Sequence, residues 1–266
     1  MSSHDNLADQ LWQARQNGTT VSDLQAPTTV DEAYALQRVT TTRCAQQVNG
    51  FKIGATVADI QKLLQLDEPF YGPLYSDFTR NNGCDLAVYP DHLPRIEPEF
   101  VVRLGKPLKA SQGKPVSRDQ VIDAVASISV AFEFVGSRVN PDLVTDSNRG
   151  LLAIADFGAN LDFIMDLERE DWQDIDLSAS PVELFINDES IATGHSGLSV
   201  AGNPLDIVAW LANAPGLADT GVDAGMLISC GTCTPAFAVN PGDKVRANYR
   251  DFGDLTCTIV KAENPA

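Results

Sequence analysis

The sequence of 266 residues predicts an α+β protein in which a helical N-terminal portion precedes a β-rich region. Helix start and stop signals cluster near the N-terminus, whereas from about Asp77 onward short apolar runs alternate with Gly, Pro, Asn and Asp. No segment repeats or has low complexity, which excludes solenoids and tethered modules. We therefore predict a helical region over residues 1–75 and a β-rich domain over residues 76–266.

The N-terminal helices are predicted from their ends. A short helix containing Leu7 and Arg15 is stopped by Gly18. The segment 29–32, Thr-Val-Asp-Glu, has the spacing of a capping box and opens a longer helix that ends near Gln46. A third helix, capped by Thr56, carries apolar side chains on one face, namely Ile60, Leu63 and Leu64.

The β-rich domain is expected to contain strands of alternating or continuous apolar character. These are the segments 95–104, 127–136, 182–188, 237–240, 244–250 and 255–260. Turns at 187–188 and 251–254 join neighbouring strands. Two helices interrupt the strands, at 117–127 with Ser117 as cap and at 204–213 with Asn203 as cap.

The formal net charge of −17 argues against nucleic acid and anionic membranes as partners, because both are bound through Lys and Arg. No apolar stretch approaches the roughly 20 residues of a membrane span, and the first residues lack the apolar run of a signal peptide. We therefore expect a cytoplasmic protein. An acidic enzyme that binds a small anion needs local positive charge, which a metal ion or a buried lysine supplies.

The cysteines and histidines favour neither a disulfide framework nor a zinc site. The five cysteines are an odd number scattered along the chain, and only Cys230 and Cys233 have C-x-x-C spacing. The alternatives for this pair are a zinc or redox site and two small buried residues, and the second is favoured because no other such pair exists. The three histidines show no H-x-x-x-H spacing.

Three glutamates form the strongest candidate site. Glu97 and Glu99 lie two apart in a predicted strand, which places both side chains on one face about 7 Å apart. Glu133 lies in the otherwise apolar or small run 128–135, where an isolated carboxylate is costly unless it is paired, protonated or bound to metal. Three oxygen ligands suit a hard cation such as Mg²⁺, or Mn²⁺ in its place. A solvated strand face is the alternative for Glu97 and Glu99 taken alone.

Two further residues are reactive candidates. Lys52 lies between Gly50 and Gly54, which permit close backbone approach, and Asp77 follows a Gly-Pro-Leu-Tyr segment. Taken alone, an ordinary surface lysine and a loop or cap aspartate are the favoured interpretations of these two positions.

The chain resembles the 2-oxopent-4-enoate hydratase and 4-oxalocrotonate decarboxylase group of the fumarylacetoacetate hydrolase superfamily. The resemblance covers most of the chain, and its motifs stand in the family's order. They are DEAYALQ (31–37), GFKIG (50–54), YGPL (71–74), RIEPE (95–99), EFVGSR (133–138) and WLAN (210–213).

The resemblance implies roles for the candidate residues. Glu97, Glu99 and Glu133 would be the Mg²⁺ ligands, Lys52 the catalytic lysine, and Asp77 its acid/base partner. The loop 231–235 matches one that lies near the substrate, which singles out Gly231, Thr232 and Thr234. The resemblance also implies a mixed β-roll catalytic domain, so that 76–266 becomes the metal-binding catalytic domain, and a homo-oligomer built from dimers.

The expected activity is a metal-dependent hydratase that adds water to a 2-hydroxy-2,4-dienoate to give a 4-hydroxy-2-oxo acid, in the catabolism of aromatic-derived acids. A 4-oxalocrotonate-type decarboxylase, an acylpyruvate carbon–carbon hydrolase and a non-catalytic metal-binding subunit that works with a partner enzyme of the same pathway are the alternatives. The segment 156–160 reads Asp-Phe-Gly-Ala-Asn where the family usually has Asp-Asn-Ala-Ser, and His195 stands where small residues are expected. Both departures leave the substrate's identity open.

Overall fold

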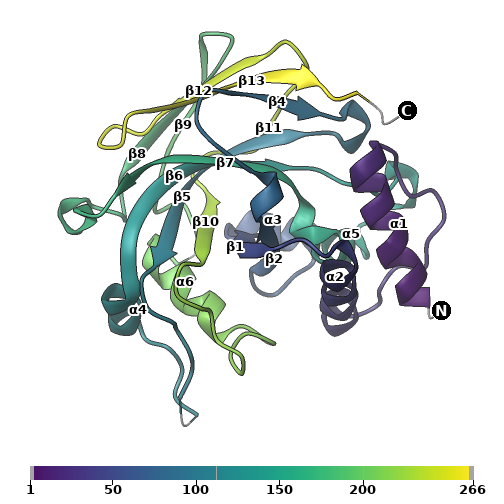
Figure 1. Ribbon diagram of the computed structural model, residues 1–266, viewed down its shortest axis with the longest axis horizontal. Helices are drawn as coiled ribbons and strands as arrows, with labels where there is room; N and C mark the ends of the chain where they lie inside the picture. The colour runs from purple at the N-terminus through teal and green to yellow at the C-terminus, as the bar shows by residue number, and fades with distance from the viewer. Residues whose placement is uncertain (1–2, 112, 200, 264–266) are drawn as a thin grey trace.

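Two β-sheets form the centre of the protein in a computed structural model that describes residues 3–111, 113–199 and 201–263 (Figure 1). The larger sheet has the order β2-β1-β10-β5-β6-β7-β3, with β11 also paired to β5. Its strands are β1 (Val48–Gly54), β2 (Phe70–Tyr75), β3 (Thr79–Arg80), β5 (Arg95–Leu104), β6 (Val125–Val135), β7 (Asn160–Arg169), β10 (Leu227–Thr232) and β11 (Phe237–Ala238). This sheet is mixed, because β1 pairs with β10 and β3 with β7 in parallel, whereas the other pairs are antiparallel.

The second sheet has the order β4-β13-β12-β8-β9. Its strands are β4 (Cys84–Val88), β8 (Pro181–Ile186), β9 (Glu189–His195), β12 (Lys244–Asn248) and β13 (Asp254–Lys261). It lies across one end of the strongly curved strands β5, β6 and β7 (Figure 1). This two-sheet arrangement with flanking helices confirms the α+β class and the mixed β architecture expected from the sequence.

Six α-helices surround the sheets in the described chain: α1 (Ser3–Asn17), α2 (Val30–Cys44), α3 (Ala58–Leu64), α4 (Arg118–Ala124), α5 (Arg149–Ala155) and α6 (Pro204–Asn213). Helices α1, α2 and α5 lie together on one side of the large sheet (Figure 1). Helices α4 and α6 contact each other near the end of β5 that is farther from the second sheet (Figure 1). Most buried apolar side chains of both sheets and of α1, α2, α5 and α6 form one large core cluster. A second, smaller cluster within the large sheet consists of Leu74, Val101, Ala131, Phe163 and Leu227. The curved strands are therefore held from both sides, which is what a rigid site requires.

Several local predictions are confirmed. The Thr29 side chain caps α2 by accepting a hydrogen bond from the Glu32 amide, and Ser117 forms a full capping box with Gln120 at α4. The Asn203 side chain caps α6 at the predicted position. The turn at 187–188 has two consecutive residues of positive φ, as a tight hairpin turn requires.

The region 1–75 differs from its prediction as purely helical, because it also contributes β1 and β2 to the large sheet. Strand β1 contains two glycines and a lysine, which have low strand propensity. Its extended conformation is stabilised by parallel pairing with β10, a segment far away in the sequence. The division of the chain at residue 75 stays a prediction.

The prediction for Thr56 is wrong. Helix α3 begins after Val57, which makes no side-chain cap bond, while Thr56 is buried. The apolar face of α3 is also unburied, since Ile60 and Leu63 are 41% and 52% exposed. Strands β7 and β10 were not predicted, and both contribute to the site described below.

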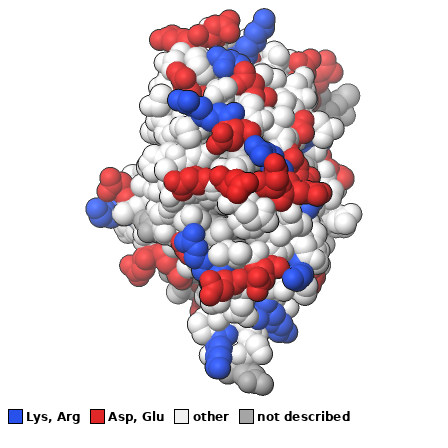
Figure 2. Space-filling view, turned by 90° about the vertical axis from the view of Figure 1, so that its left-hand side faces the viewer, with Lys and Arg blue, Asp and Glu red and all other residues white. Residues whose placement is uncertain are grey.

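Acidic residues outnumber basic ones in the chain, 36 to 19. Figure 2 shows them distributed over the face in view, with fewer Lys and Arg between them. No described helix combines the length and the apolar character that a membrane crossing requires.

Candidate active site

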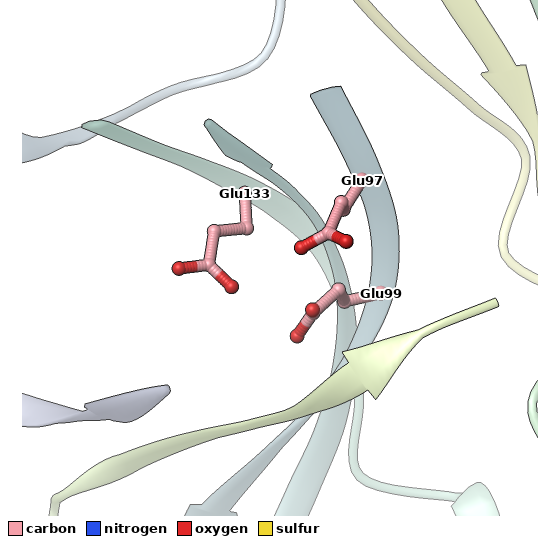
Figure 3. Close-up of side chains that lie close together, drawn as sticks. All are labelled: Glu97, Glu99 and Glu133. Atoms are coloured by element: carbon pink, nitrogen blue, oxygen red, sulfur yellow. The ribbon is translucent and has the colours of Figure 1, made fainter. Parts of the chain in front are cut away.

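Strands β5 and β6 bring the three predicted glutamates together. Glu97 is directly opposite Glu133 in the antiparallel register, and Glu99 follows two residues later on the same face of β5. One carboxylate oxygen from each residue lies within 4.8 Å of the others. The three side chains point toward one another from neighbouring strands (Figure 3). Among the described residues, this is the group of carboxylates, histidines or cysteines with a metal-binding arrangement.

Neighbouring strands hold two of these carboxylates by hydrogen bonds. The Ser229 hydroxyl and the Gly231 amide, both on β10, donate to Glu99 Oε2, the amide at 3.0 Å. Glu133 Oε1 accepts from Lys52 Nζ at 3.1 Å and from Asn160 Nδ2 at 3.2 Å. Glu133 Oε2 is buried and has no hydrogen-bond partner in the described structure.

A hard cation fits this donor set. A buried carboxylate oxygen without a partner is costly, and the cost disappears when the oxygen coordinates a metal. Glu133 Oε2 is such an atom, and two further carboxylates face the same point. Oxygen ligands alone are the preference of Mg²⁺, Mn²⁺ and Ca²⁺ rather than of zinc.

Lys52 is the buried cation of the site. It lies on β1 between β2 and β10, is 2% exposed, and forms its ion pair with the fully buried Glu133. Gly50 permits the close approach of β1 to β10, because a Cβ there would lie 2.1 Å from the Leu227 carbonyl oxygen. The alternative of an ordinary surface lysine is therefore excluded.

The electrostatics of the cluster are set by burial and mutual repulsion. Burial acts to lower the pKa of Lys52, but the combined negative field of Glu133, Glu97 and Glu99 outweighs it and raises that pKa above its ordinary value. Lys52 is accordingly protonated at neutral pH.

The pKa values of the three glutamates are also raised, but burial is the main cause. Burial, followed by repulsion from Glu133, raises the pKa of Glu97 to about 7, although part of its side chain reaches solvent. The same two causes raise the pKa of Glu99, and burial raises that of Glu133 despite the nearby Lys52 ammonium. Because metal ligands must be deprotonated, binding of a divalent cation to these three carboxyl groups would compete with protons and become tighter as pH rises.

The predicted substrate loop lies next to the glutamates. Gly231 has φ of 95°, and a Cβ there would lie 2.4 Å from the Thr56 hydroxyl oxygen, so Thr56 closes the site behind this loop. Thr232 is paired with Glu99 in the β5·β10 register, and its hydroxyl donates to the Thr234 carbonyl. The Thr234 hydroxyl donates to the backbone of Pro235. Substrate contacts of Gly231, Thr232 and Thr234 stay a prediction.

The structure does not bring Asp77 to the glutamates. It lies in a short 3-10 helix (Ser76–Phe78) after β2, is exposed, and lines a cavity of about 400 Å³ with Arg80 and Asp162. None of the hydrogen bonds or ion pairs found among the described residues connects it to Lys52. Its predicted role as acid/base partner of Lys52 remains a prediction.

Sequence reasoning missed Asn160, which contacts Glu133 from the start of β7. It lies at the end of the segment 156–160, whose departure from the family pattern was the available signal. The same segment is tied down by Arg138, which is fully buried and pairs with Asp156 at 2.7 Å.

The remaining candidates lie away from the cluster or are explained by packing. Cys230 and Cys233 are buried free thiols, as the favoured interpretation predicted. His195 is exposed at the end of β9, where its Nδ1 accepts from the Gly197 amide.

Comparisons with known proteins agree with this geometry. The family model described as fumarylacetoacetate (FAA) hydrolase C-terminal matches residues 83–260, which include all three glutamates. The 2-keto-4-pentenoate hydratase of Paraburkholderia xenovorans is 30% identical over 258 residues, covering 94% of this chain and 93% of that protein. The 2-oxo-hept-4-ene-1,7-dioate hydratase of Escherichia coli is 29% identical over 257 residues, covering 95% of each.

Among solved structures, a 4-oxalocrotonate decarboxylase from Pseudomonas putida, complexed with magnesium and adipate, has the same fold. It has a TM-score of 0.85 and 23% identity over 97% of each chain. The family resemblance predicted from the sequence is confirmed. This chain belongs to the fumarylacetoacetate hydrolase family, in the group that contains the 2-keto-4-pentenoate hydratases.

Proposed function

We propose that this protein is a divalent-metal-dependent hydratase that adds water to a 2-hydroxy-2,4-dienoate and yields a 4-hydroxy-2-oxo acid. The observation that carries the proposal is the buried cluster of three glutamates with Lys52 beside it. The hydratases that match over more than nine-tenths of the chain support the reaction class. We assign Mg²⁺ as the ion, with Mn²⁺ as a substitute, because all three ligands are carboxylates.

Bound among Glu97, Glu99 and Glu133, the cation would supply the positive charge that stabilises negative charge on the substrate's carboxylate and 2-oxygen. Ser229 and Gly231 keep Glu99 oriented toward the centre of the cluster by occupying its Oε2. Lys52 and Asn160 do the same for Glu133 by occupying Oε1, which leaves Oε2 directed to the ligand position.

Lys52 is the proton carrier in this proposal. Protonation of the dienol at its far carbon gives an α,β-unsaturated ketone, and water then adds at C4. Its Nζ lies 3.1 Å from Glu133 Oε1 and is buried beside the proposed ligand position, so the ammonium group is placed to act as a general acid toward the substrate. Asp77 is kept in the proposal as a residue to be tested, and an Asp77→Asn variant with normal turnover would remove it.

The proposal is tested by following dienol absorbance with Mg²⁺ on 2-hydroxypenta-2,4-dienoate, 4-oxalocrotonate and an acylpyruvate, with products identified by mass. Gain of water supports the hydratase. Loss of CO₂ or cleavage of the carbon chain would instead support the decarboxylase or the hydrolase, because the three glutamates suit each of these reactions. Metal binding with no turnover on any of the three would support a non-catalytic subunit.

The assignment of the site is tested with Glu133→Gln, and Glu168→Gln is the matched control. Glu168 is a β7 carboxylate that pairs with Arg103 outside the cluster. We expect Glu133→Gln to lose Mg²⁺-dependent turnover and Glu168→Gln to retain it. Unchanged metal dependence in Glu133→Gln would refute the site.

Three further expectations belong to the proposal: a homo-oligomer built from dimers, a location in the cytoplasm, and possible assembly with an enzyme of the same pathway. The exposed Ile60 and Leu63 on α3 support oligomerisation, because a second copy would remove them from water. Sedimentation equilibrium and fractionation of cell extracts measure these properties directly.

A further inference from the structure

We infer that Arg15, in the N-terminal helix α1, is a positioning residue that orients Asn160 and through it the metal-facing carboxylate of Glu133. This inference rests on the proposed metal site. It adds α1, which contributes none of the three glutamates, to the machinery that sets metal affinity.

The first step is the orientation of the Asn160 amide. Arg15 Nη2 lies 3.4 Å from Asn160 Oδ1, and Asn160 Nδ2 lies 3.2 Å from Glu133 Oε1. A guanidinium offers only donors and a carboxylate only acceptors, so the amide satisfies both neighbours in one orientation alone. The flipped amide would place two donors together on one side and two acceptors together on the other. Asn160 Nδ2 also donates to the Asp162 carbonyl at 3.5 Å, so Arg15 on the oxygen side and two acceptors on the nitrogen side favour the same orientation, in which Asn160 donates to Glu133.

The second step is the backbone that carries Asn160. Three consecutive residues before it have positive φ: Phe157 at 55°, Gly158 at 66° and Ala159 at 62°. Such a conformation is costly for Phe and Ala and persists only where the surroundings hold it. The site thus depends on whatever fixes this turn.

Two buried arginines that are far apart in the sequence, Arg15 and Arg138, hold the turn. Arg15 Nη1 and Arg138 Nη1 both donate to the Asn160 carbonyl, each at 2.7 Å. Both guanidiniums also stack on the Phe157 ring, at 4.9 Å and 5.1 Å from its centroid. Arg138 is neutralised by Asp156, whereas Arg15 has no carboxylate within ion-pair distance in the described part of the chain.

The third step is the cost of this arrangement. Arg15 is 6% exposed, and its Nε is buried without a hydrogen-bond partner. A buried guanidinium next to another guanidinium destabilises the fold unless its contacts compensate. Its hydrogen bonds are directed at the backbone of Asn160 and Leu161 and at the Asn160 amide. Arg15 also lies over the Phe78 ring at 4.1 Å, and two of its three hydrogen bonds hold Asn160 directly.

The consequence is that docking of α1 and metal affinity are linked. Glu133 Oε1 is occupied by Lys52 and Asn160, so that Oε2 is left for the cation. Without Arg15, Asn160 Oδ1 loses its guanidinium donor and the Asn160 carbonyl keeps only its bond from Arg138, so one of the two restraints on Glu133 is weakened. Partners of metal ligands typically change metal affinity about 10- to 100-fold when removed.

The experiment is a double-mutant cycle read by metal binding without substrate, with free Mn²⁺ measured by electron paramagnetic resonance at pH 8. The variants are Arg15→Met, Asn160→Leu and the two combined. We expect each single variant to raise the Mn²⁺ dissociation constant about tenfold. The double variant should resemble Asn160→Leu alone, because Arg15 acts through Asn160.

Asp9→Asn is the matched control, since Asp9 also lies on α1 and ties it to α2 through Arg43 at the surface. It should change the dissociation constant less than about twofold. Arg15→Lys keeps the positive charge, and its ammonium group can donate to the Asn160 carbonyl oxygen but cannot reach Asn160 Oδ1 at the same time. If Arg15→Met does not fold, Arg15→Lys replaces it in the experiment, and we expect its Mn²⁺ dissociation constant to be about threefold higher than that of wild type, or more.

Two outcomes overturn the inference. One is an unchanged dissociation constant in Arg15→Met or Arg15→Lys while Glu133→Gln weakens binding. The other is a double variant whose effect is the product of the two single effects. A wild-type protein that binds no Mn²⁺ would refute the proposed function together with the inference, so the two failures are distinguishable.

Discussion

Replacing Asp156 by asparagine removes the negative charge that neutralises the most deeply buried arginine of the protein. Arg138 is 0% and Asp156 2% exposed, with Arg138 Nε 2.7 Å from Asp156 Oδ1. The Arg138 amide also donates to Asp156 Oδ2 at 2.8 Å, and Nη2 donates to the Asp156 carbonyl. The variant keeps a side-chain oxygen for one of these bonds but leaves the guanidinium charge uncompensated.

The magnitude follows from this burial. Breaking one partner of a buried ion pair costs about 3 to 5 kcal/mol, and we expect the lower end, about 3 kcal/mol, because the asparagine retains one acceptor. The unfolding entropy of a chain of this length is about 0.6 kcal/mol per kelvin at the melting temperature. The melting temperature should therefore fall by about 5 °C.

Urea unfolding followed by tryptophan fluorescence and scanning calorimetry measure the two quantities. The matched control is Asp171→Asn, because Asp171 pairs with Arg169 at 2.7 Å but is 73% exposed. It should cost far less stability than Asp156→Asn, because solvent screens the exposed pair. If Asp156→Asn lost no more stability than this control, the argument from burial would be refuted.

Three other variants test separate parts of the structure. Lys52→Met should leave the Mn²⁺ dissociation constant within about tenfold of wild type and lower kcat by about 10²- to 10⁴-fold, measured by titration and by dienol absorbance; normal turnover would exclude Lys52 as the proton carrier. Asp162→Asn tests a carboxyl group whose pKa is raised by burial to about 6. The folded state therefore binds this proton more tightly than the unfolded state, and the wild-type protein loses stability as pH rises through about 4 to 6. The variant should be about 1 to 3 kcal/mol more stable than wild type at pH 8 and equal to it at pH 4 in urea unfolding, and a difference independent of pH would contradict this. Gly72→Ala would place a Cβ 2.5 Å from the Phe157 carbonyl oxygen. The variant should lose about 1 to 3 kcal/mol of stability and have lower turnover, because the turn at 157–159 beside Lys52 must move. A fully active variant with wild-type stability would show that this turn can move without affecting the site.

Local signals predicted those parts of the fold that depend on neighbours in sequence. Capping residues predicted α2, α4 and α6, and apolar patterning predicted β5, β6, β12 and β13 to within a few residues. The prediction for Thr56 failed because a single threonine can cap a helix or pack behind a glycine, and only the position of Gly231 decides between them. Strand β1 was missed for a similar reason, since its pairing with β10 is not local.

For the three glutamates too, some features were predictable from the local sequence and others depended on strand pairing. The i, i+2 spacing of Glu97 and Glu99 and the apolar surroundings of Glu133 were visible in the sequence, because strand geometry and the cost of burying a carboxylate are general. That Glu133 lies opposite Glu97 required the register of β5 and β6.

The sequence by itself determined the family, the α+β class, the acidic character and the identity of the metal-ligand candidates, since motif order and residue type are carried by the chain directly. Only the tertiary structure decided that Lys52 is buried against Glu133, that Asp77 lines a cavity with Arg80 and Asp162, and that Arg15 contacts Asn160, which contacts Glu133. These relations join residues from α1, β1, β6 and β7, and no local rule of spacing specifies contacts between segments that meet only when the chain folds.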